Sequence, residues 1–427
     1  MKPSLRELTL ASLKIGCLGF GGPAGQIALM HRVFVEEKRW LDESRYLHAL
    51  SFCTLLPGPE AQQLATYAGW MLRGAVGGLI AGLLFVLPGA AVVFALSWLY
   101  AAHGDLAAVA AAFGGIKAAV LALVAEALLR VGRRALKGRA DIAIAAAAFV
   151  ALALFSLPFP VVIVIAALLG AIRGATDADA DSAPVEAGPS RVRTLGVVLL
   201  WALLWLAPLG VSALILGDGH WLTRLGAVFA TLAATSFGGA YALLAWLQQQ
   251  AVEAHGWLTT AQMVDGLGLA ETTPGPLVLV NQFVGFMAGW NATGGKVGWA
   301  AAGASMAAWQ TFVPSFLFIF AGAPYAEALR RSRRARGALG AVMAAVLGVI
   351  ASLAVWFAGH VLFTGGTDFR WPWGATVHAP DLASLDLAAA ALTLAAGVAL
   401  IRLRAHVIVV IVGCAAAGLA RWAVGWS

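Results

Sequence analysis

The stretch Leu56-Pro57-Gly58-Pro59-Glu60 and a second copy, Thr273-Pro274-Gly275-Pro276, interrupt two otherwise apolar segments of the chain. A helix cannot continue through Pro-Gly-Pro, because proline lacks the backbone N–H and disfavours helix in the residue before it. Proline does suit the first turn of a helix that follows. We therefore predict a helix break at each copy, with a new helix starting near Pro59 and another near Pro276.

Two more motifs recur at matching distances from the Pro-Gly-Pro copies. Phe20-Gly21-Gly22 returns as Phe237-Gly238-Gly239, and Trp40-Leu41 returns as Trp257-Leu258. Each pair, like the Pro-Gly-Pro pair, is offset by 217 residues. Three motifs in one constant register indicate an internal duplication. We expect a helix to start again after each Phe-Gly-Gly as well.

Composition places the whole duplication in a membrane. Of the 427 residues, 61% are hydrophobic and 11% are charged, with a mean hydropathy of +0.85. A soluble protein of this length needs more charge on its surface, and apolar runs near 20 residues can cross a bilayer core of about 30 Å. The sequence predicts an all-α polytopic membrane protein with spans at 75–101, 107–129, 140–157, 158–172, 193–216, 297–322, 337–362, 384–401 and 405–425.

The net charge is +7, and the basic residues lie mostly in short loops between these spans. This pattern favours a role in membrane orientation over nucleic-acid binding. The Arg-rich loops at 130–139 and 330–336 are expected in the cytoplasm, whereas 101–106 and 363–383 are poor in Lys and Arg and are expected outside. The protein is therefore expected in the inner (plasma) membrane, with a cytoplasmic N-terminus and an outer C-terminus.

The loop charges also predict the domain organisation. We expect a first repeat at 1–173, an acidic cytoplasmic linker at 174–192, an extra transmembrane helix at 193–216 and a second repeat at 217–427. Equivalent loops of the two repeats carry opposite charge signals, so the repeats are expected in inverted topology, a common transporter plan. The four spans between 75 and 172 alone would leave the two repeats parallel. The extra helix makes five crossings, and an odd number of crossings inverts the second repeat.

The motif segments, 8–35 and 44–72 with their copies 222–250 and 260–290, suit re-entrant hairpins. About ten helical residues at 1.5 Å each reach the middle of the bilayer. In the first repeat, basic residues flank both ends of these segments, which places both ends on the same side. A broken helix that crosses straight through remains the alternative for either segment.

Four helix N-termini that converge at mid-membrane would make an anion site, because each presents free backbone N–H groups and a partial positive charge. Glycine at the tips would let a ligand approach the backbone closely. The candidate binding residues lie in or beside the breaks: Phe20, Gly21, Gly22, Pro57, Gly58, Pro59, Gln62, Gln63, Phe237, Gly238, Gly239, Thr272, Thr273, Pro274, Gly275, Pro276, Asn281 and Gln282.

Three charged residues lie in apolar surroundings and are candidates for ion coupling or charge compensation. Glu60 and Glu271 could carry coupling protons, since intramembrane carboxylates are costly; Glu60 could instead stabilise the first turn of its helix. Lys117 could pair with an anion or a carboxylate, or its side chain could reach toward the membrane surface. The three cysteines show no CxxC spacing, so no metal or other cofactor is expected.

These same motifs resemble the chromate transporter family, specifically its long members with two domains. The resemblance extends over nearly the whole chain and includes Leu56–Ala61, Pro88-Gly89 and Val313-Pro314-Ser315 beside the motifs above. It implies export of chromate from the cytoplasm, chromate resistance and coupling to protons or to the membrane potential, as in an antiporter. Sulfate is the chemically similar oxyanion.

Two alternatives to a chromate exporter stay open. One is a carrier for sulfate or another tetrahedral oxyanion. The other is a membrane enzyme acting on lipid phosphates, which would need an acidic or metal-binding cluster such as DxxxD, and the sequence has none at membrane depth. We therefore expect a transporter rather than an enzyme. The oligomeric state, with a homodimer among the candidates, is not determined by the sequence.

Overall fold

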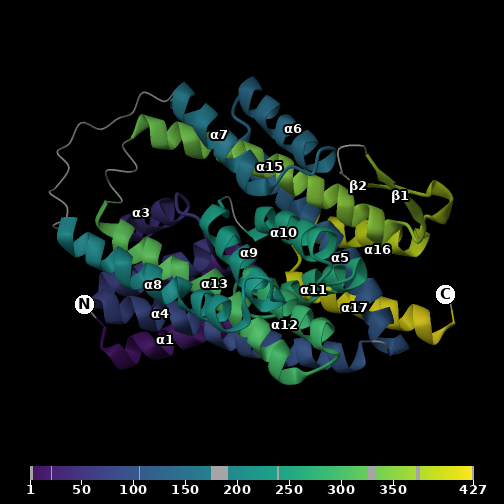
Figure 1. Ribbon diagram of the computed structural model, residues 1–427, viewed down its shortest axis with the longest axis horizontal. Coiled ribbons are helices and arrows are strands. Elements are labelled where there is room, and N and C mark those ends of the chain that lie inside the picture. The colour runs from purple at the N-terminus through teal and green to yellow at the C-terminus, as the bar shows by residue number, and fades with distance from the viewer. Residues whose placement is uncertain are drawn as a thin grey trace. The chain divides into compact units, whose positions relative to one another are not determined.

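The computed structural model describes residues 3–20, 22–104, 106–174, 191–237, 240–325, 332–371 and 376–425 (Figure 1). These ranges are mostly helical. Within them, five helices are long and apolar enough to cross a membrane, which agrees with an all-helical membrane protein. They are α4 (Glu60–His103), α5 (Ala107–Ala135), α8 (Arg191–Leu216), α13 (Val297–Gly322) and α15 (Arg333–Leu362).

Shorter helices and turns fill most of the remaining described chain. The helices are α1 (Leu5–Leu18), α2 (Gly22–His31), α3 (Glu43–Cys53), α6 (Arg139–Ala153), α7 (Phe159–Arg173), α9 (Trp221–Thr235), α10 (Ala240–Gln248), α11 (Thr260–Thr272), α12 (Val280–Thr293), α16 (Leu387–Gly397) and α17 (Val407–Ala423). Single π-helical turns cover Arg32–Glu37, Gln249–Ala254 and Val398–Arg402, and 3-10 turns cover Leu277–Leu279, Ala323–Tyr325 and Leu382–Ser384.

One small β-hairpin departs from the all-helical prediction. Strands β1 (Gly366–Arg370) and β2 (Thr376–Pro380) pair antiparallel, with Gly366 opposite Pro380. The hairpin lies in the stretch 363–383, where the sequence predicts a loop outside the membrane.

The predicted helix starts are confirmed. After the first Phe-Gly-Gly, α2 begins at Gly22, and after the second, α10 begins at Ala240. After the first Pro-Gly-Pro, α4 begins at Glu60, and after the second, a 3-10 turn at Leu277 leads into α12. At both Pro-Gly-Pro motifs, proline and glycine therefore stand between the end of one helix and the start of the next.

Local backbone structure recurs with the same offset as the motifs. The π-turns Arg32–Glu37 and Gln249–Ala254 stand 217 residues apart. After them, Trp40 N–H donates to Phe34 O at 2.9 Å, and Trp257 N–H donates to Ala251 O at 2.7 Å. The paired Trp-Leu motifs thus mark a backbone turn that both copies adopt.

Contacts divide the chain into two compact units, each built from separate stretches. The first comprises Met1–Trp98, Gly174–Ala240 and Thr273–Arg336, and the second comprises Leu99–Arg173, Tyr241–Thr272 and Gly337–Ser427. Each unit combines stretches from both predicted repeats, so the compact units do not correspond to the predicted repeats. Residues 175–190, most of the predicted linker, lie outside the described residues.

Close glycine packing shapes the first unit. Helix α4 is interrupted at Arg73 and Gly74, where the backbone is not helical. Its two arms then meet so closely that a side chain on Gly69 would collide with the carbonyl oxygen of Gly77. Helices α12 and α13 meet in the same way through Gly285 and Gly303. Such contacts through small residues are how helices approach closely in membranes.

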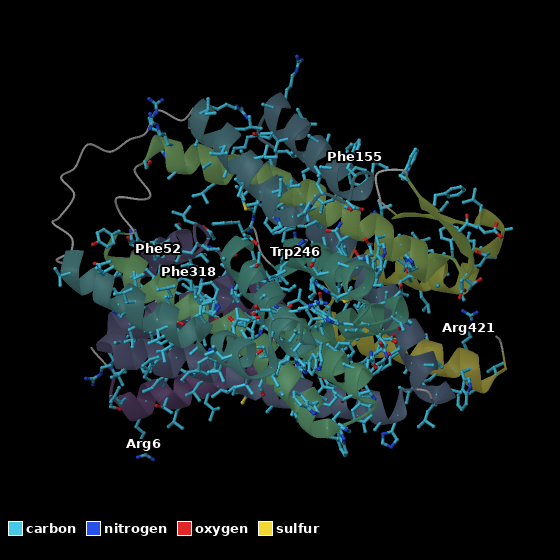
Figure 2. The ribbon with its side chains drawn as sticks, viewed as in Figure 1. Arg6, Phe52, Phe155, Trp246, Phe318 and Arg421 are labelled. Carbon is cyan, nitrogen blue, oxygen red and sulfur yellow. The ribbon has the colours of Figure 1, made fainter. Side chains whose placement is uncertain are left out.

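Helix α3 is held against α4 in this unit by aromatic contact. Phe52, labelled in Figure 2, is 2% exposed and lies edge-on to Tyr67 with ring centroids 5.4 Å apart. Tyr46 of α3 donates to the carbonyl oxygen of Ile27 in α2 at 2.6 Å. The helices on either side of the first Trp-Leu turn are therefore fixed to one another and to α4.

In the second unit, α5 is the central helix. It packs along α16 and α17 around a core that includes Ala122, Leu123 and Ile411. Glycines again permit the approach, because a side chain at Gly115 would collide with the carbonyl oxygen of Cys414. On another face, α11 packs on α5, where Gly268 lies beside Ile116.

Helix α6 is shorter than the span predicted at 140–157, and α7 is as short as the span predicted at 158–172. Helices α6 and α7 have 15 residues each, and at 1.5 Å per residue such a helix is about 22 Å long. That is less than the hydrocarbon core of about 30 Å. A turn that includes Ser156, with φ 48°, separates the two helices.

Candidate functional site

Two reciprocal backbone hydrogen bonds join the motif breaks in the first unit. Gly58 N–H donates to the carbonyl oxygen of Ser236 at 2.9 Å, and Gly275 N–H donates to that of Gly19 at 3.0 Å. Both donors and both acceptors are related by the offset of 217 residues. Each Pro-Gly-Pro break is thus bonded to the residue that precedes Phe-Gly-Gly in the other copy. Reciprocal contact of this kind is the pattern of a two-fold pair.

The local backbone of the two copies agrees at each partner. Gly58 has φ 112° and Gly275 has φ 92°, a region that side chains disfavour, which is why glycine stands at both positions. A tight turn encloses each acceptor. Phe20 N–H donates to Leu18 O at 2.9 Å, and Phe237 N–H donates to Thr235 O at 3.0 Å. The site therefore rests on two copies of the same pair of turns.

Proline-containing segments of α4 and α13 lie against the breaks. A side chain on Gly89, which follows Pro88, would collide with the carbonyl oxygen of Pro274. In the other copy, Ser315 follows Pro314, and its hydroxyl lies 3.5 Å from where a Cβ of Gly58 would stand. Ser315 is 1% exposed, and its hydroxyl has no hydrogen-bond partner.

Buried amides hold the carbonyl groups of the breaks. Gln63 Nε2 donates to Pro57 O at 2.6 Å. Gln26 Nε2 donates to Gly275 O at 2.5 Å and to Gly19 O at 3.2 Å. Sequence analysis did not select Gln26, although it lies in the helix that starts at the first Phe-Gly-Gly. A glutamine in an apolar segment is the signal that could have identified it.

The other predicted amides also bond within the unit. Gln62 Nε2 donates to Phe312 O at 3.3 Å, Gln282 Nε2 donates to Ala90 O at 3.0 Å, and Asn281 Nδ2 donates to Thr311 Oγ1 at 2.9 Å. Each of these three side chains keeps a buried oxygen without a partner. These amides therefore position the helices around the breaks while leaving polar atoms unsatisfied inside the unit.

No charged side chain is fully buried among the described residues of the first unit. Its buried polar groups are uncharged: Ser12, Gln26, Gln62, Gln63, Thr66, Ser97, Ser212, Thr223, Ser236, Thr273, Asn281, Gln282, Gln310, Thr311 and Ser315. Glu60 is half-buried in the first turn of α4. The electrostatics near the breaks thus come from backbone and side-chain dipoles, with Glu60 as the nearby carboxylate.

The structure brings only part of the predicted site together. Phe20, Gly22, Phe237, Thr273 and both Pro-Gly-Pro copies belong to the first unit. Gly21, Gly238 and Gly239 lie outside the described residues. Thr272, Glu271 and Lys117 belong to the second unit. There, Glu271 is 6% exposed and accepts a hydrogen bond from the Tyr241 hydroxyl at 2.7 Å.

Lys117 has a carboxylate partner that sequence analysis did not select. Its ammonium lies 2.9 Å from Asp265 Oδ1, and the Tyr100 hydroxyl donates to Asp265 Oδ2 at 2.7 Å. The rule that selected Glu271, a carboxylate in an apolar segment, also applies to Asp265. Among the described residues, no group of three or more His, Cys, Asp or Glu could hold a metal ion.

Helices of spanning length and paired helix breaks define a predominantly helical integral membrane protein. A family model described as "Chromate transporter" matches residues 6–171 and 223–419, and the chain belongs to the chromate transporter family. The two matched stretches leave out 172–222, which contains α8 and the predicted linker. Membership of this family makes the protein a transporter.

Curated relatives extend over most of the chain. It is 32% identical over 393 residues to the "Chromate transport protein" of Pseudomonas aeruginosa, covering 87% of this chain and 88% of that one. It is 30% identical to the "Probable chromate transport protein" of Synechococcus elongatus (75% and 76% covered) and 29% identical to the "Chromate transport protein" of Cupriavidus metallidurans (75% of each). No solved structure matches the chain.

Proposed function

We propose that this protein is a secondary carrier that exports chromate from the cytoplasm through a site formed by the paired helix breaks. The observation that carries the proposal is the reciprocal pair of bonds, Gly58 N–H to Ser236 O and Gly275 N–H to Gly19 O. This pair of bonds joins each Pro-Gly-Pro break to the residue before Phe-Gly-Gly of the other copy, within one unit. In that unit, backbone dipoles rather than buried cations determine the electrostatics. The curated relatives named for chromate transport support chromate as the cargo.

The same bonds support inverted repeats. A two-fold axis that lies in the membrane plane relates two copies of opposite orientation. The short helices α6 and α7 leave this argument intact. Whether they cross one after the other or together form a hairpin that returns to the same side, the number of crossings changes by two. The predicted odd number of crossings, and with it the inverted placement of the second repeat, is the same in both cases.

Helix starts can hold a tetrahedral dianion without a cationic cage. The first N–H groups of α2, α4 and the 3-10 turn at Leu277 have no acceptor within their own helices, and helix N-termini carry a partial positive charge. Ser315 adds a hydroxyl beside Gly58 that has no partner. Donors of this kind suit phosphate-like anions, and binding by dipoles allows release, which a carrier needs.

Coupling to protons is assigned to Glu271. Its carboxylate is buried and accepts from Tyr241, and a buried carboxylate at membrane depth is costly unless it has a function. Glu60, in the first turn of α4, is the second candidate. The outward driving force on a divalent anion also includes the membrane potential, about 2.3 kcal/mol per charge for each 100 mV.

Inside-out membrane vesicles provide the test of this function. Vesicles that contain the protein should accumulate labelled chromate when an inside-positive potential is imposed, and vesicles without it should not. Excess sulfate distinguishes a chromate carrier from a sulfate carrier. Weak competition by sulfate supports a chromate carrier. Accumulation of sulfate in preference to chromate supports a sulfate carrier. Vesicles that accumulate neither anion contradict the proposal.

A further inference from the structure

The second unit contains an ion pair between Lys117 and Asp265, and we expect it near the middle of the membrane. Lys117 stands ten residues after Ala107, where α5 begins, and ten residues of helix extend about 15 Å. That is about half of the hydrocarbon core of about 30 Å. The Lys117 side chain is 24% exposed and that of Asp265 is 11% exposed. Such a pair is costly in a membrane and is a functional candidate for that reason.

Lys117 also lines a cavity of about 600 Å³ in the same unit. The cavity lies between the first part of α5, the end of α15, the start of α16 and the end of α17, with Gly114, His360 and Arg421 in its wall. Figure 2 labels Arg421 on α17. The volume is large enough for a tetrahedral oxyanion together with several waters, since a water occupies about 30 Å³ of liquid.

The two cations of the cavity wall are held in different ways. Arg421 is fixed by two bonds from Nη1 to the carboxylate of Asp386, at 3.0 and 2.9 Å. Asp386 also accepts from the backbone N–H groups of Ala388 and Ala389 at the start of α16. Lys117 makes a single contact to Asp265, whose other oxygen accepts from Tyr100. Lys117 is therefore the cation that can exchange partners.

We propose that this cavity is a vestibule for a small divalent oxyanion, and that Lys117 stays paired with Asp265 until the anion enters. An anion in the cavity competes with Asp265 for the ammonium of Lys117. The Tyr100 hydroxyl keeps the carboxylate in place when the ammonium leaves it. The pair gives a neutral resting state at membrane depth, and its exchange keeps anion binding weak enough for release. The inference rests on the proposed function only for the identity of the anion.

Cysteine labelling can measure the charge preference of the cavity without any transport. Gly114→Cys places a thiol in the cavity wall, where a Cβ would meet nothing within 4 Å. The background variant has alanine in place of Cys17, Cys53 and Cys414, which are the three native cysteines. The readout is the labelling rate with an anionic sulfonatoethyl methanethiosulfonate divided by the rate with its cationic trimethylammonium analogue.

Lys117→Gln should lower this ratio about tenfold, and Asp265→Asn should raise it about tenfold, because one unit charge nearby attracts one reagent and repels the other. The double variant Lys117→Gln/Asp265→Asn should return to within about twofold of the parent, since the neutral pair leaves no charge unpaired. Gly219→Cys, in the loop after α8 with open space around it, is the control position and should show the same ratio in every background.

Sulfate should slow labelling at position 114 in the parent and in Asp265→Asn, and should have no effect in Lys117→Gln. Sulfate is the probe because chromate oxidises thiols. Equal ratios in all backgrounds, or sulfate protection that persists without Lys117, would overturn the vestibule. The proposed carrier function is judged separately by chromate accumulation in vesicles. The labelling results can therefore contradict the vestibule while chromate accumulation still supports the carrier function. Conversely, the vesicles can fail to accumulate chromate while the labelling results still support the vestibule.

Discussion

Gly58 donates its backbone N–H to Ser236, and the bond is repeated in the opposite sense between Gly275 and Gly19. Neither break can shift without disturbing the turn before Phe-Gly-Gly in the other copy. The two predicted repeats are therefore bonded to each other beside their helix breaks. In the proposed carrier, these bonds would keep the site intact while the surrounding helices move.

Alanine at either glycine should stop transport while the protein still inserts. Gly58→Ala places a Cβ 2.9 Å from Gln63 Nε2, and Gly275→Ala places one 3.0 Å from Leu279 Cδ1. We expect at least a tenfold loss of chromate flux in vesicles for each. The control is Gly217→Ala, whose φ of 86° is close to that of Gly275 but which has open space around it. It carries a backbone cost of about 1–2 kcal/mol and should keep most of the flux. Equal losses in all three would mean that strain alone explains the effect.

Removing the charge of Glu271 should uncouple transport from the pH gradient. Glu271→Gln keeps a side-chain acceptor for the Tyr241 hydroxyl, which lies 2.7 Å from the carboxylate, but it cannot exchange a proton. Flux driven by the membrane potential should remain, and its response to an imposed pH gradient should disappear. Glu60→Gln is the comparison. If Glu60→Gln loses the pH response and Glu271→Gln keeps it, the coupling residue is Glu60.

The two glycine crossings should be equally intolerant of added bulk. Gly69→Ala collides with the Gly77 carbonyl and Gly285→Ala with that of Gly303. Overpacking of this kind costs about 1–3 kcal/mol, so both variants should melt at lower temperature in detergent. Gly196→Ala, on α8 with nothing within 4 Å of a Cβ, should melt like the parent. A parent-like melting temperature for Gly69→Ala would mean that the arms of α4 separate more easily than the structure indicates.

Acid should weaken the start of α16. Burial raises the pKa of Asp386, but the backbone N–H groups of Ala389 and Ala388 and the Arg421 guanidinium lower it by more, so the pKa lies below its usual 3.8. A carboxyl whose pKa is lower in the folded state stabilises the fold above about pH 4, and this contribution is lost as the pH falls through the folded-state pKa. Because both side chains keep some exposure to solvent, 20% for Asp386 and 34% for Arg421, we expect less than about 1 kcal/mol.

Thermal unfolding in detergent as a function of pH measures this contribution. The parent should lose more stability than Asp386→Asn on passing from neutral pH to below about pH 4, because the variant has no carboxyl to protonate there. Parallel losses in the two proteins would show that the bonds around Asp386 do not stabilise the fold.

Sequence motifs predicted the helix starts because proline and glycine act locally. Gly22, Glu60 and Leu277 follow directly from the chemistry of the preceding residues. The constant offset of the motifs marked Trp40 and Trp257 as equivalent positions, but the backbone turn that both adopt was not predicted. The small hairpin of β1 and β2 was not predicted, because the whole stretch 363–383 was assigned to a loop outside the membrane.

The partners of the breaks could not be predicted in the same way. Gly19 and Ser236 act through backbone carbonyl groups, which leave no trace in residue type. Asp265 lies 148 residues from Lys117, and only the packing of α11 on α5 brings the two together. Local rules find where helices stop, whereas the pairing of distant breaks depends on tertiary packing.

The inverted arrangement of the two repeats is tested most directly by the accessibility of two equivalent residues. Ser44 and Ala261 stand 217 residues apart, both exposed and both in the first turn of their helices, α3 and α11. Each is replaced by cysteine in the cysteine-free background and labelled in intact cells with a membrane-impermeant maleimide. The account predicts that Ala261→Cys is labelled from outside and that Ser44→Cys is labelled only after the membrane is opened. Labelling of both positions from the same side would contradict it.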